Sequence, residues 1–213
     1  MTDRTFNGWP EDFQRFFIGL ELDNSKRYFE ANRDLYQRAV RGPMEALVAS
    51  FEEEFGPAKV FRINRDIRFS ADKSPYKTNI AATVGMGGRG GYISLDARGL
   101  MVASGRYEMD SPTLQRYREA VHRDGATLAA IVAKLEADGF QIGGEELKRA
   151  PQGYPGDHPH SRLLRHKRLY AWKSFGLQPW LGTAAARDRV REAWSQAEPL
   201  NRWLHANLDR EAE

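Results

Sequence analysis

Two polar segments hold most of the side chains that could do chemistry. The first spans residues 62–77, with five cations against two aspartates, and its candidate ligand-binding residues are Arg62, Arg65, Arg68, Lys73, Tyr76 and Lys77. The second spans residues 148–167, and its candidate ligand-binding residues are Lys148, Arg149, Tyr154, Arg165, His166 and Lys167. Arginine binds carboxylates and phosphates through two parallel hydrogen bonds. We therefore predict that the two segments face each other and form one pocket for a small anionic molecule.

Three further residues are candidates for proton transfer. His158 and His160 lie among cations, which favour the neutral imidazole and make it a base near neutral pH. Asp66 lies between two arginines in the sequence, and nearby cations favour the ionised carboxylate. Asp66 is therefore a poor general acid, and we expect it to orient an arginine or a histidine. We predict these three as catalytic residues if the protein is an enzyme, which the sequence leaves open.

Residues 157–160 have the sequence Asp-His-Pro-His, a pattern that could also bind a metal ion. Histidines two positions apart in extended chain point the same way and can share an ion. The surrounding cations would repel a divalent ion, so we predict no metal site and no cofactor. The other two histidines, His122 and His205, fall in expected helices, and we assign them no role.

Two alternatives explain the same cations without a pocket. In the first, the polar centre is an internal ion network of a structural or partner-binding protein. Arg65 is diagnostic, because strict alternation places it on the apolar face, where it would need Asp66 or Asp72 as a partner. In the second, the protein is a nucleic-acid-binding module whose cations contact phosphates. The chain outside residues 62–77 is close to charge balance, which favours the pocket.

The elements that position these segments follow from hydrophobic spacing. We predict an N-terminal helical part over residues 10–56, a strand-rich centre over 60–107, helices over 111–138, a polar loop over 143–167 and C-terminal helices over 183–208. Asn24 or Ser25 is the expected cap of the second helix, and Gly42-Pro43 its expected break. Ser111 is the expected cap of the helix that follows the strands, with a kink at Asp124-Gly125.

Strands are expected over residues 60–70, 79–85, 91–96, 100–107, 140–142 and 168–175, and one helical turn over 145–150. Closely spaced strands with tight turns favour antiparallel pairing. The prediction is an α+β fold, in which a mainly antiparallel sheet of about five to six strands packs with N-terminal, central and C-terminal helices. At 213 residues the chain is expected to form a single domain.

Composition excludes several classes of protein. The chain has no cysteine, so it has no disulfide, thiolate zinc site or cysteine nucleophile. No apolar run approaches the length of a membrane span, and the N-terminal residues lack the apolar segment of a secretory signal. We expect a cytoplasmic protein without membrane contact, and the sequence leaves its oligomeric state open. A formal net charge of +3 is compatible with nucleic acid without requiring it.

Three blocks of sequence resemble one known family. Residues 62–77 contain the pattern RxxRDxRF followed by DKxPYK, and residues 147–154 and 157–167 form a second block that ends in Leu-Leu-Arg-His-Lys. The early run Asn24-Ser25-Lys26, with the aromatic residues that follow it, forms the third. Together they resemble the domain of unknown function 2461 family of bacteria and fungi, over nearly the whole chain. The resemblance implies a single-domain protein and no established activity.

Overall fold

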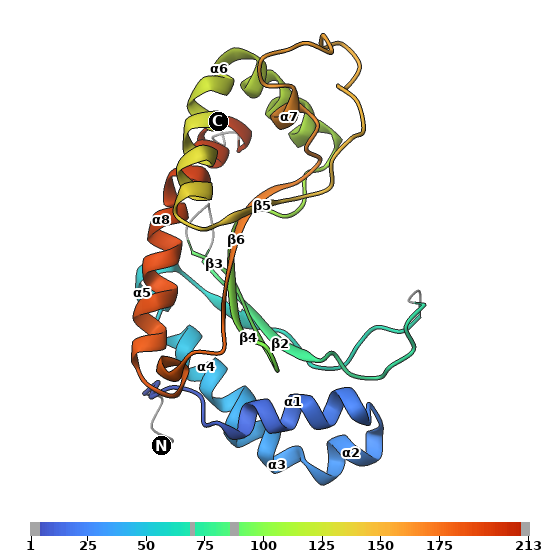
Figure 1. Cartoon of the computed structure of the whole chain (residues 1–213), viewed down its shortest axis with the longest axis vertical. Coiled ribbons are helices and arrows are strands. Elements are labelled where there is room, and N and C mark those ends of the chain that lie inside the picture. Colours follow the sequence, from blue (N-terminus) through green and yellow to red (C-terminus); the bar gives the residue numbers. More distant parts are fainter. Residues whose placement is uncertain (1–4, 69–70, 86–89, 210–213) are drawn as a thin grey trace. The chain divides into compact units, whose positions relative to one another are not determined.

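The computed structural model describes residues 5–68, 71–85 and 90–209 (Figure 1). Its centre is a six-stranded sheet in the order β1-β2-β3-β4-β6-β5. The strands are β1 (Ala58–Val60), β2 (Asn79–Val84), β3 (Gly91–Asp96), β4 (Gly99–Arg106), β5 (Gln141–Gly143) and β6 (Leu169–Gly176). β1 pairs antiparallel with β2, and β5 pairs antiparallel with β6. The predicted α+β fold with an antiparallel sheet is confirmed.

Helices precede, interrupt and follow the strands in the chain. The first group is α1 (Asp12–Leu22), α2 (Lys26–Ala31), α3 (Arg33–Tyr36), the π-helix η1 (Gln37–Arg41), α4 (Gly42–Ala49) and α5 (Glu52–Phe55). The later ones are α6 (Ser111–Ala137), α7 (Ser161–Leu164), the 3₁₀ helix η2 (Pro179–Gly182) and α8 (Ala185–Leu208). None of the helices in the described ranges combines the length and the apolar character needed to cross a bilayer.

The chain divides into two compact units. Unit 1 comprises residues 1–86, 92–102 and 174–192, and unit 2 comprises residues 87–91, 103–173 and 193–213. Unit 1 buries an aromatic cluster in which the rings of Phe16, Phe29 and Tyr36 touch one another. Unit 2 buries Tyr117, Leu164 and other apolar side chains of α6, α7 and α8. That the chain is one domain stays a prediction, because compactness alone does not define a domain.

The expected helix break at Gly42-Pro43 is wrong, because the chain stays helical there. Gly42 has helical backbone angles, φ −58° and ψ −49°, and its N–H donates to the carbonyl of Gln37, five residues earlier. A Cβ atom on Gly42 would lie 2.8 Å from that carbonyl oxygen, so the wide turn requires glycine. Pro43, which has no N–H, then begins the first turn of α4. The helices break instead near Asn32 and Ser50.

The predicted strand over residues 60–70 is also wrong, since β1 ends at Val60. Beyond it, residues 61–68 and 71–78 form the two sides of an arm that extends away from the sheet before β2 begins (Figure 1). Its two sides meet at one isolated bridge, between Asn64 and Tyr76. The alternation of side chains does not bury one face: Ile63 is buried, whereas Ile67, farther out on the described part of the arm, is 39% exposed. Phe69 and Ser70 lie outside the described residues.

One asparagine fixes the base of the arm. Asn24, between α1 and α2, accepts a hydrogen bond from the N–H of Tyr76 at 3.0 Å and donates one to its carbonyl at 3.1 Å. The ring of Tyr76 stacks on Phe29 at a centroid distance of 4.4 Å. Ser25, the alternative cap, accepts from the N–H of Tyr28 and begins α2. The two adjacent residues therefore have separate tasks, one for the helix and one for the arm.

We expect Asn24→Ala to destabilise the protein by about 1–3 kcal/mol, because the partly buried N–H of Tyr76 loses its acceptor and the carbonyl of Tyr76 keeps only a 3.5 Å hydrogen bond from Arg65. Urea unfolding followed by circular dichroism measures the loss. The matched control is Asn7→Ala, since the side chain of Asn7 makes only an exposed 3.5 Å contact with the carbonyl of Thr5. Equal stability of the two variants would contradict the role given to Asn24.

Candidate functional site

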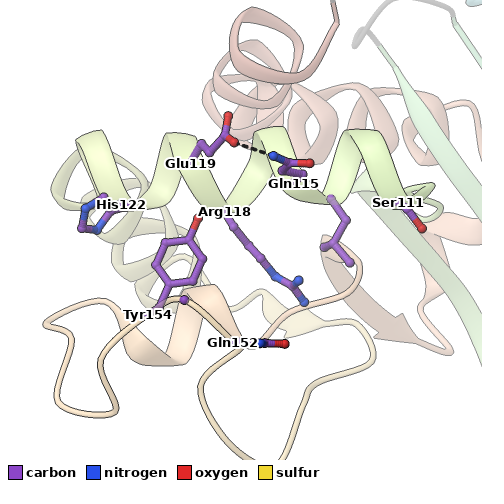
Figure 2. A pocket seen from close by; sticks show the side chains of 9 residues that line it. Ser111, Gln115, Arg118, Glu119, His122, Gln152 and Tyr154 are labelled. Carbon is purple, nitrogen blue, oxygen red and sulfur yellow. Dashed lines mark hydrogen bonds between the residues drawn. The ribbon is translucent and has the colours of Figure 1, made fainter.

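A pocket of unit 2 lies between the first half of α6 and the 151–160 loop, with a volume of about 650 Å³. Figure 2 shows its side chains from α6 above the loop. The lining residues are Ser111, Leu114, Gln115, Arg118, Glu119 and His122 from α6, and Gln152, Gly153 and Tyr154 from the loop. This volume lies in the range of small-molecule sites.

The pocket side of α6 is opposite a stripe that enters the core. Tyr117 and Val121 are fully buried, and the hydroxyl of Tyr117 donates to the carbonyl of Leu163 at 2.9 Å. The helix cap is Asp110 and not Ser111 as predicted, because the Asp110 carboxylate accepts from the N–H of Thr113 at 2.9 Å. Ser111 is thereby left at the pocket wall.

The predicted kink of α6 is confirmed at Asp124, where φ is −142° and ψ is 45°. The kink brings the helix backbone against the loop. A Cβ atom on Gly125 would lie 2.4 Å from Cδ2 of His160, so the imidazole packs in the space that glycine leaves open. The sequence Asp124-Gly125 therefore both bends the helix and seats the loop.

The loop is held by short-range backbone hydrogen bonds of its own. The N–H of Tyr154 donates to Pro151, and that of His158 donates to Pro155. Ser161 donates to His158 and so begins the short helix α7. The expected helical turn over residues 145–150 is wrong, because that segment has no helical residue and Glu146 forms a bridge with His166.

Two histidines join the loop to the helix in a directed chain. Nδ1 of His158 lies 3.1 Å from the backbone N–H of His160, and Nε2 of His158 lies 3.0 Å from Nδ1 of His122. A backbone N–H can only donate, so Nδ1 of neutral His158 has no proton and Nε2 carries it. His158 then donates to His122, whose own proton lies on Nε2.

This chain opposes protonation of His158. Its pKa lies below the ordinary value because of partial burial and the neighbouring imidazoles of His122 and His160. If Nδ1 of His158 were protonated, its N–H would point at the backbone N–H of His160, and two donors cannot form a hydrogen bond with each other. The same tautomer disfavours a metal ligand role, because a ligating nitrogen must be free of its proton. Within the described part of the chain, no three acidic or histidine side chains are arranged to hold a metal ion.

Arg118 is the cation of the pocket. Its Nε atom is enclosed and has no hydrogen-bond partner, and no carboxylate among the described residues lies within ion-pair distance of its guanidinium. In Figure 2 the guanidinium extends from α6 toward the loop, beside Tyr154 and Gln152. A guanidinium that faces a pocket without a counter-charge can bind an anion there through charge-assisted hydrogen bonds, which marks Arg118 as a candidate anion site.

Tyr154 closes the pocket from the loop. Its ring lies 5.6 Å from that of His122 and 6.5 Å from that of His158, in both cases edge to face. Partial burial and the Glu119 carboxylate raise the pKa of the phenol, against the opposing effect of Arg118. The phenol is therefore protonated and can donate a hydrogen bond near neutral pH.

The other predicted residues of the second segment lie away from this pocket. Arg165 and His166 lie 3.5 Å from Glu146, and Lys167 pairs with Glu145. Lys148 and Arg149 are exposed. His166 is only 1% exposed, and its Nε2 atom lies 3.5 Å from the Glu146 carboxylate.

The first segment lies on the arm, in unit 1, and most of its cations have internal partners. Arg65, whose side chain is 29% exposed, pairs with Asp72 at 2.9 Å, and Arg68 pairs with Asp66 at 2.7 Å. Lys73 and Lys77 donate to backbone carbonyls of the arm. Hydrogen bonds from Arg68 lower the pKa of Asp66, as an orienting carboxylate requires. The Arg65–Asp72 pair is the contact that the ion-network alternative predicts.

The two segments thus belong to different units, and a pocket between them stays a prediction. The pocket of unit 2 includes Tyr154 of the predicted set, and His158 and His160 adjoin it. Sequence reasoning missed Arg118, Glu119 and His122. Their only signal is spacing, because positions 111, 115, 118, 119 and 122 share one helix face, and such a polar face is ordinarily solvated.

We expect nitrogen NMR of the histidine rings near pH 7 to show His158 as the Nε2–H tautomer. The physical reason is the fixed donor at His160, which occupies Nδ1 of His158. Two-bond correlations between ring nitrogens and ring protons assign the tautomer. His205 serves as internal comparison, because its Nδ1 faces the Asp209 carboxylate at 2.7 Å and so must carry a proton. A proton on Nδ1 of His158 would contradict the chain.

The buried His166 side chain should make the stability of the protein depend on pH below neutrality. Burial lowers the pKa of His166 from its ordinary 6.5, with Glu146 acting in the opposite direction. Between the folded and unfolded pKa values, the unfolded state binds more protons, so stability falls as pH falls through 6.5 toward the folded value. Above 6.5 this effect is absent. His166→Phe should therefore lose less stability than the wild type between pH 7 and pH 5 in urea unfolding.

The ring proton of His166 in NMR provides a check that does not depend on the variant folding. Its titration midpoint in the wild-type protein should lie below 6.5. A midpoint at or above 6.5 would show that Glu146 dominates over burial.

The comparisons with known proteins concern the whole chain. No curated protein matches the sequence significantly. A family model described as "Conserved hypothetical protein (DUF2461)" matches residues 12–203. That range includes the arm, the sheet, the kinked α6 and the 151–160 loop, in agreement with the resemblance of the sequence blocks. The chain belongs to the DUF2461 family.

Proposed function

We propose that this protein binds a small anionic molecule, of which a phosphate ester is the simplest kind, in the pocket between α6 and the 151–160 loop. The observation that supports it is Arg118. Its guanidinium extends into a cavity of about 650 Å³ and has no counter-charge among the described residues. An anion in the cavity would supply that charge through charge-assisted hydrogen bonds.

Two other arginines of α6 differ from Arg118 because they have hydrogen-bond partners within the protein. Arg116 donates to the carbonyl of Leu208 at 2.8 Å and to Thr113 at 2.9 Å, and Arg123 donates to Asn207 at 2.8 Å. These two side chains hold α6 against the end of α8. Arg118, between them in sequence, points to the opposite side and has no such task, which favours a ligand over an internal network at this position.

The other polar groups suit recognition of an oxyanion. Nε2 of His122 carries a proton in the tautomer deduced above, and the Tyr154 phenol is protonated, so both can donate to oxygen atoms of a ligand. Ser111 and Gln152 add further donors at the wall. The His158–His122 pair would also accept or return a proton if the ligand reacts, and this is the route by which the site would serve an enzyme.

The nucleic-acid alternative has less support. It needs an extended surface of free cations, whereas Arg65, Arg68, Lys73 and Lys77 of the arm have partners within the arm. The same pairs favour the ion-network alternative for residues 62–77. The proposal therefore assigns that segment to the support of the arm and the anion to Arg118.

We expect Arg118→Gln to weaken the binding of ethyl phosphate at least tenfold, since charge-assisted hydrogen bonds are worth roughly 1.5–3 kcal/mol. Isothermal titration calorimetry at fixed ionic strength measures the affinity. The matched control is Arg123→Gln, on the same helix but outside the pocket lining, which should bind like the wild type. The proposal fails if wild-type protein does not bind ethyl phosphate, or if both variants bind it equally well.

A further inference from the structure

The chain of hydrogen bonds that joins the 151–160 loop to α6 has no place for an additional proton. The backbone N–H of His160 donates to Nδ1 of His158 at 3.1 Å, and Nε2 of His158, which carries the proton, donates to Nδ1 of His122 at 3.0 Å. Both acceptors are ring nitrogens without a proton. The chain therefore exists only while the two imidazoles are neutral.

An added proton can occupy either of two positions, and each breaks one hydrogen bond of the chain. On Nδ1 of His158 it would point at the backbone N–H of His160, and on Nδ1 of His122 it would point at the Nε2–H of His158. Two donors cannot bond to each other. If His158 moved its own proton to Nδ1 in order to accept from protonated His122, the conflict with His160 would return. Protonation of the pair thus costs the loop one of its two directional bonds.

The middle of the loop has few other contacts. A Cβ atom added to Gly153 or to Gly156 would meet no atom of the described chain within 4 Å, so this part of the loop packs loosely. The end of the loop differs, because the imidazole of His160 lies where a Cβ atom on Gly125 would be only 2.4 Å from it. Loss of a directional bond should therefore release residues 152–158 and leave His160 seated against α6.

The groups around His158 determine the direction of the pH effect. α6 presents His122 to it, and the loop presents Tyr154, Asp157 and His160. Partial burial and the two imidazoles lower the pKa of His158, and the exposed Asp157 acts in the opposite direction. In a released loop the imidazole would have its ordinary pKa of about 6.5. The released form then binds the proton more readily, so a fall in pH below 6.5 favours it.

We propose that the 151–160 loop is an acid-sensitive latch on the pocket, closed near neutral pH and opened when the His158–His122 pair takes up a proton. Opening moves Tyr154 away from Arg118, the two side chains that Figure 2 shows on the loop and helix sides of the pocket, and an anion held between them is released. The release rests on the proposed anion site, whereas the latch does not. Simple electrostatics has the opposite sign, because a new positive charge beside the pocket would by itself strengthen anion binding.

The test of the latch measures heteronuclear Overhauser effects of the backbone amides of residues 152–158 at pH 7 and pH 5. In the wild type they should fall from values of ordered backbone to those of a flexible segment, while the amides of α6 change little. His158→Asn keeps an acceptor for the His160 N–H and cannot take up a proton, so its loop should give the same values at both pH values. The matched control is His205→Asn, a histidine of α8 outside the loop, which should respond like the wild type.

The test of release uses calorimetric titration with ethyl sulfate, whose charge is the same at both pH values. The wild type should bind it about threefold or more weakly at pH 5 than at pH 7, because one proton is linked to opening, and His158→Asn should bind it equally at both. Unchanged loop amides in the wild type, or a wild-type response in His158→Asn, would overturn the latch and leave the anion site in place. Tighter binding at pH 5 would overturn the release. Absence of ethyl phosphate and ethyl sulfate binding at pH 7 would overturn the anion site, while the amides still decide the latch.

Discussion

The hydrogen bond from the backbone N–H of His160 to Nδ1 of His158 is the constraint on which the site depends. The 151–160 loop contains neither helix nor strand, and its own backbone hydrogen bonds are few and short-range. That one donor decides where the proton of His158 lies, and the proton then reaches His122 on α6. The loop is thereby joined to the helix in one orientation, which places Tyr154 opposite Arg118. The packing of His160 against Gly125 and of Tyr154 against His122 adds to this directional bond in holding the loop wall of the pocket.

Much of the fold follows from local patterns in the sequence. The strands at residues 79–84, 91–96 and 99–106 are short segments with glycine-rich turns between them, and their predicted bounds differ from the observed ones by about one residue. The kink at Asp124 is visible because glycine and aspartate interrupt an otherwise continuous apolar stripe. Such features depend on residues close together in the chain, and sequence reasoning has direct access to them.

The errors arise where the structure depends on distant partners. Residues 60–70 alternate like a strand, yet β1 ends at Val60, and the described residues of the arm beyond it form only the isolated bridge between Asn64 and Tyr76. The candidate site shows the same limit. Arg118 resembles Arg116 and Arg123 in sequence, and only the positions of Leu208 and Asn207 on α8 distinguish them. Because residues 62–77 are rich in cations, the sequence predicts ligand binding there, but Arg65 forms an ion pair with Asp72 of the same segment.

The π-helix at residues 37–41 determines which side chains of the N-terminal helices face the core. Tyr36, Val40, Met44 and Val48 are all buried and are spaced four apart. In a regular α-helix of 3.6 residues per turn, this spacing would drift around the axis and carry the last residues away from the core. The wider turn that ends at Gly42 compensates for the difference between a spacing of four residues and the 3.6 residues of a regular turn. The π-helix thus accommodates one residue more than a regular α-helix would hold over the same length. Deletion of one residue from this segment would rotate α4 relative to α3.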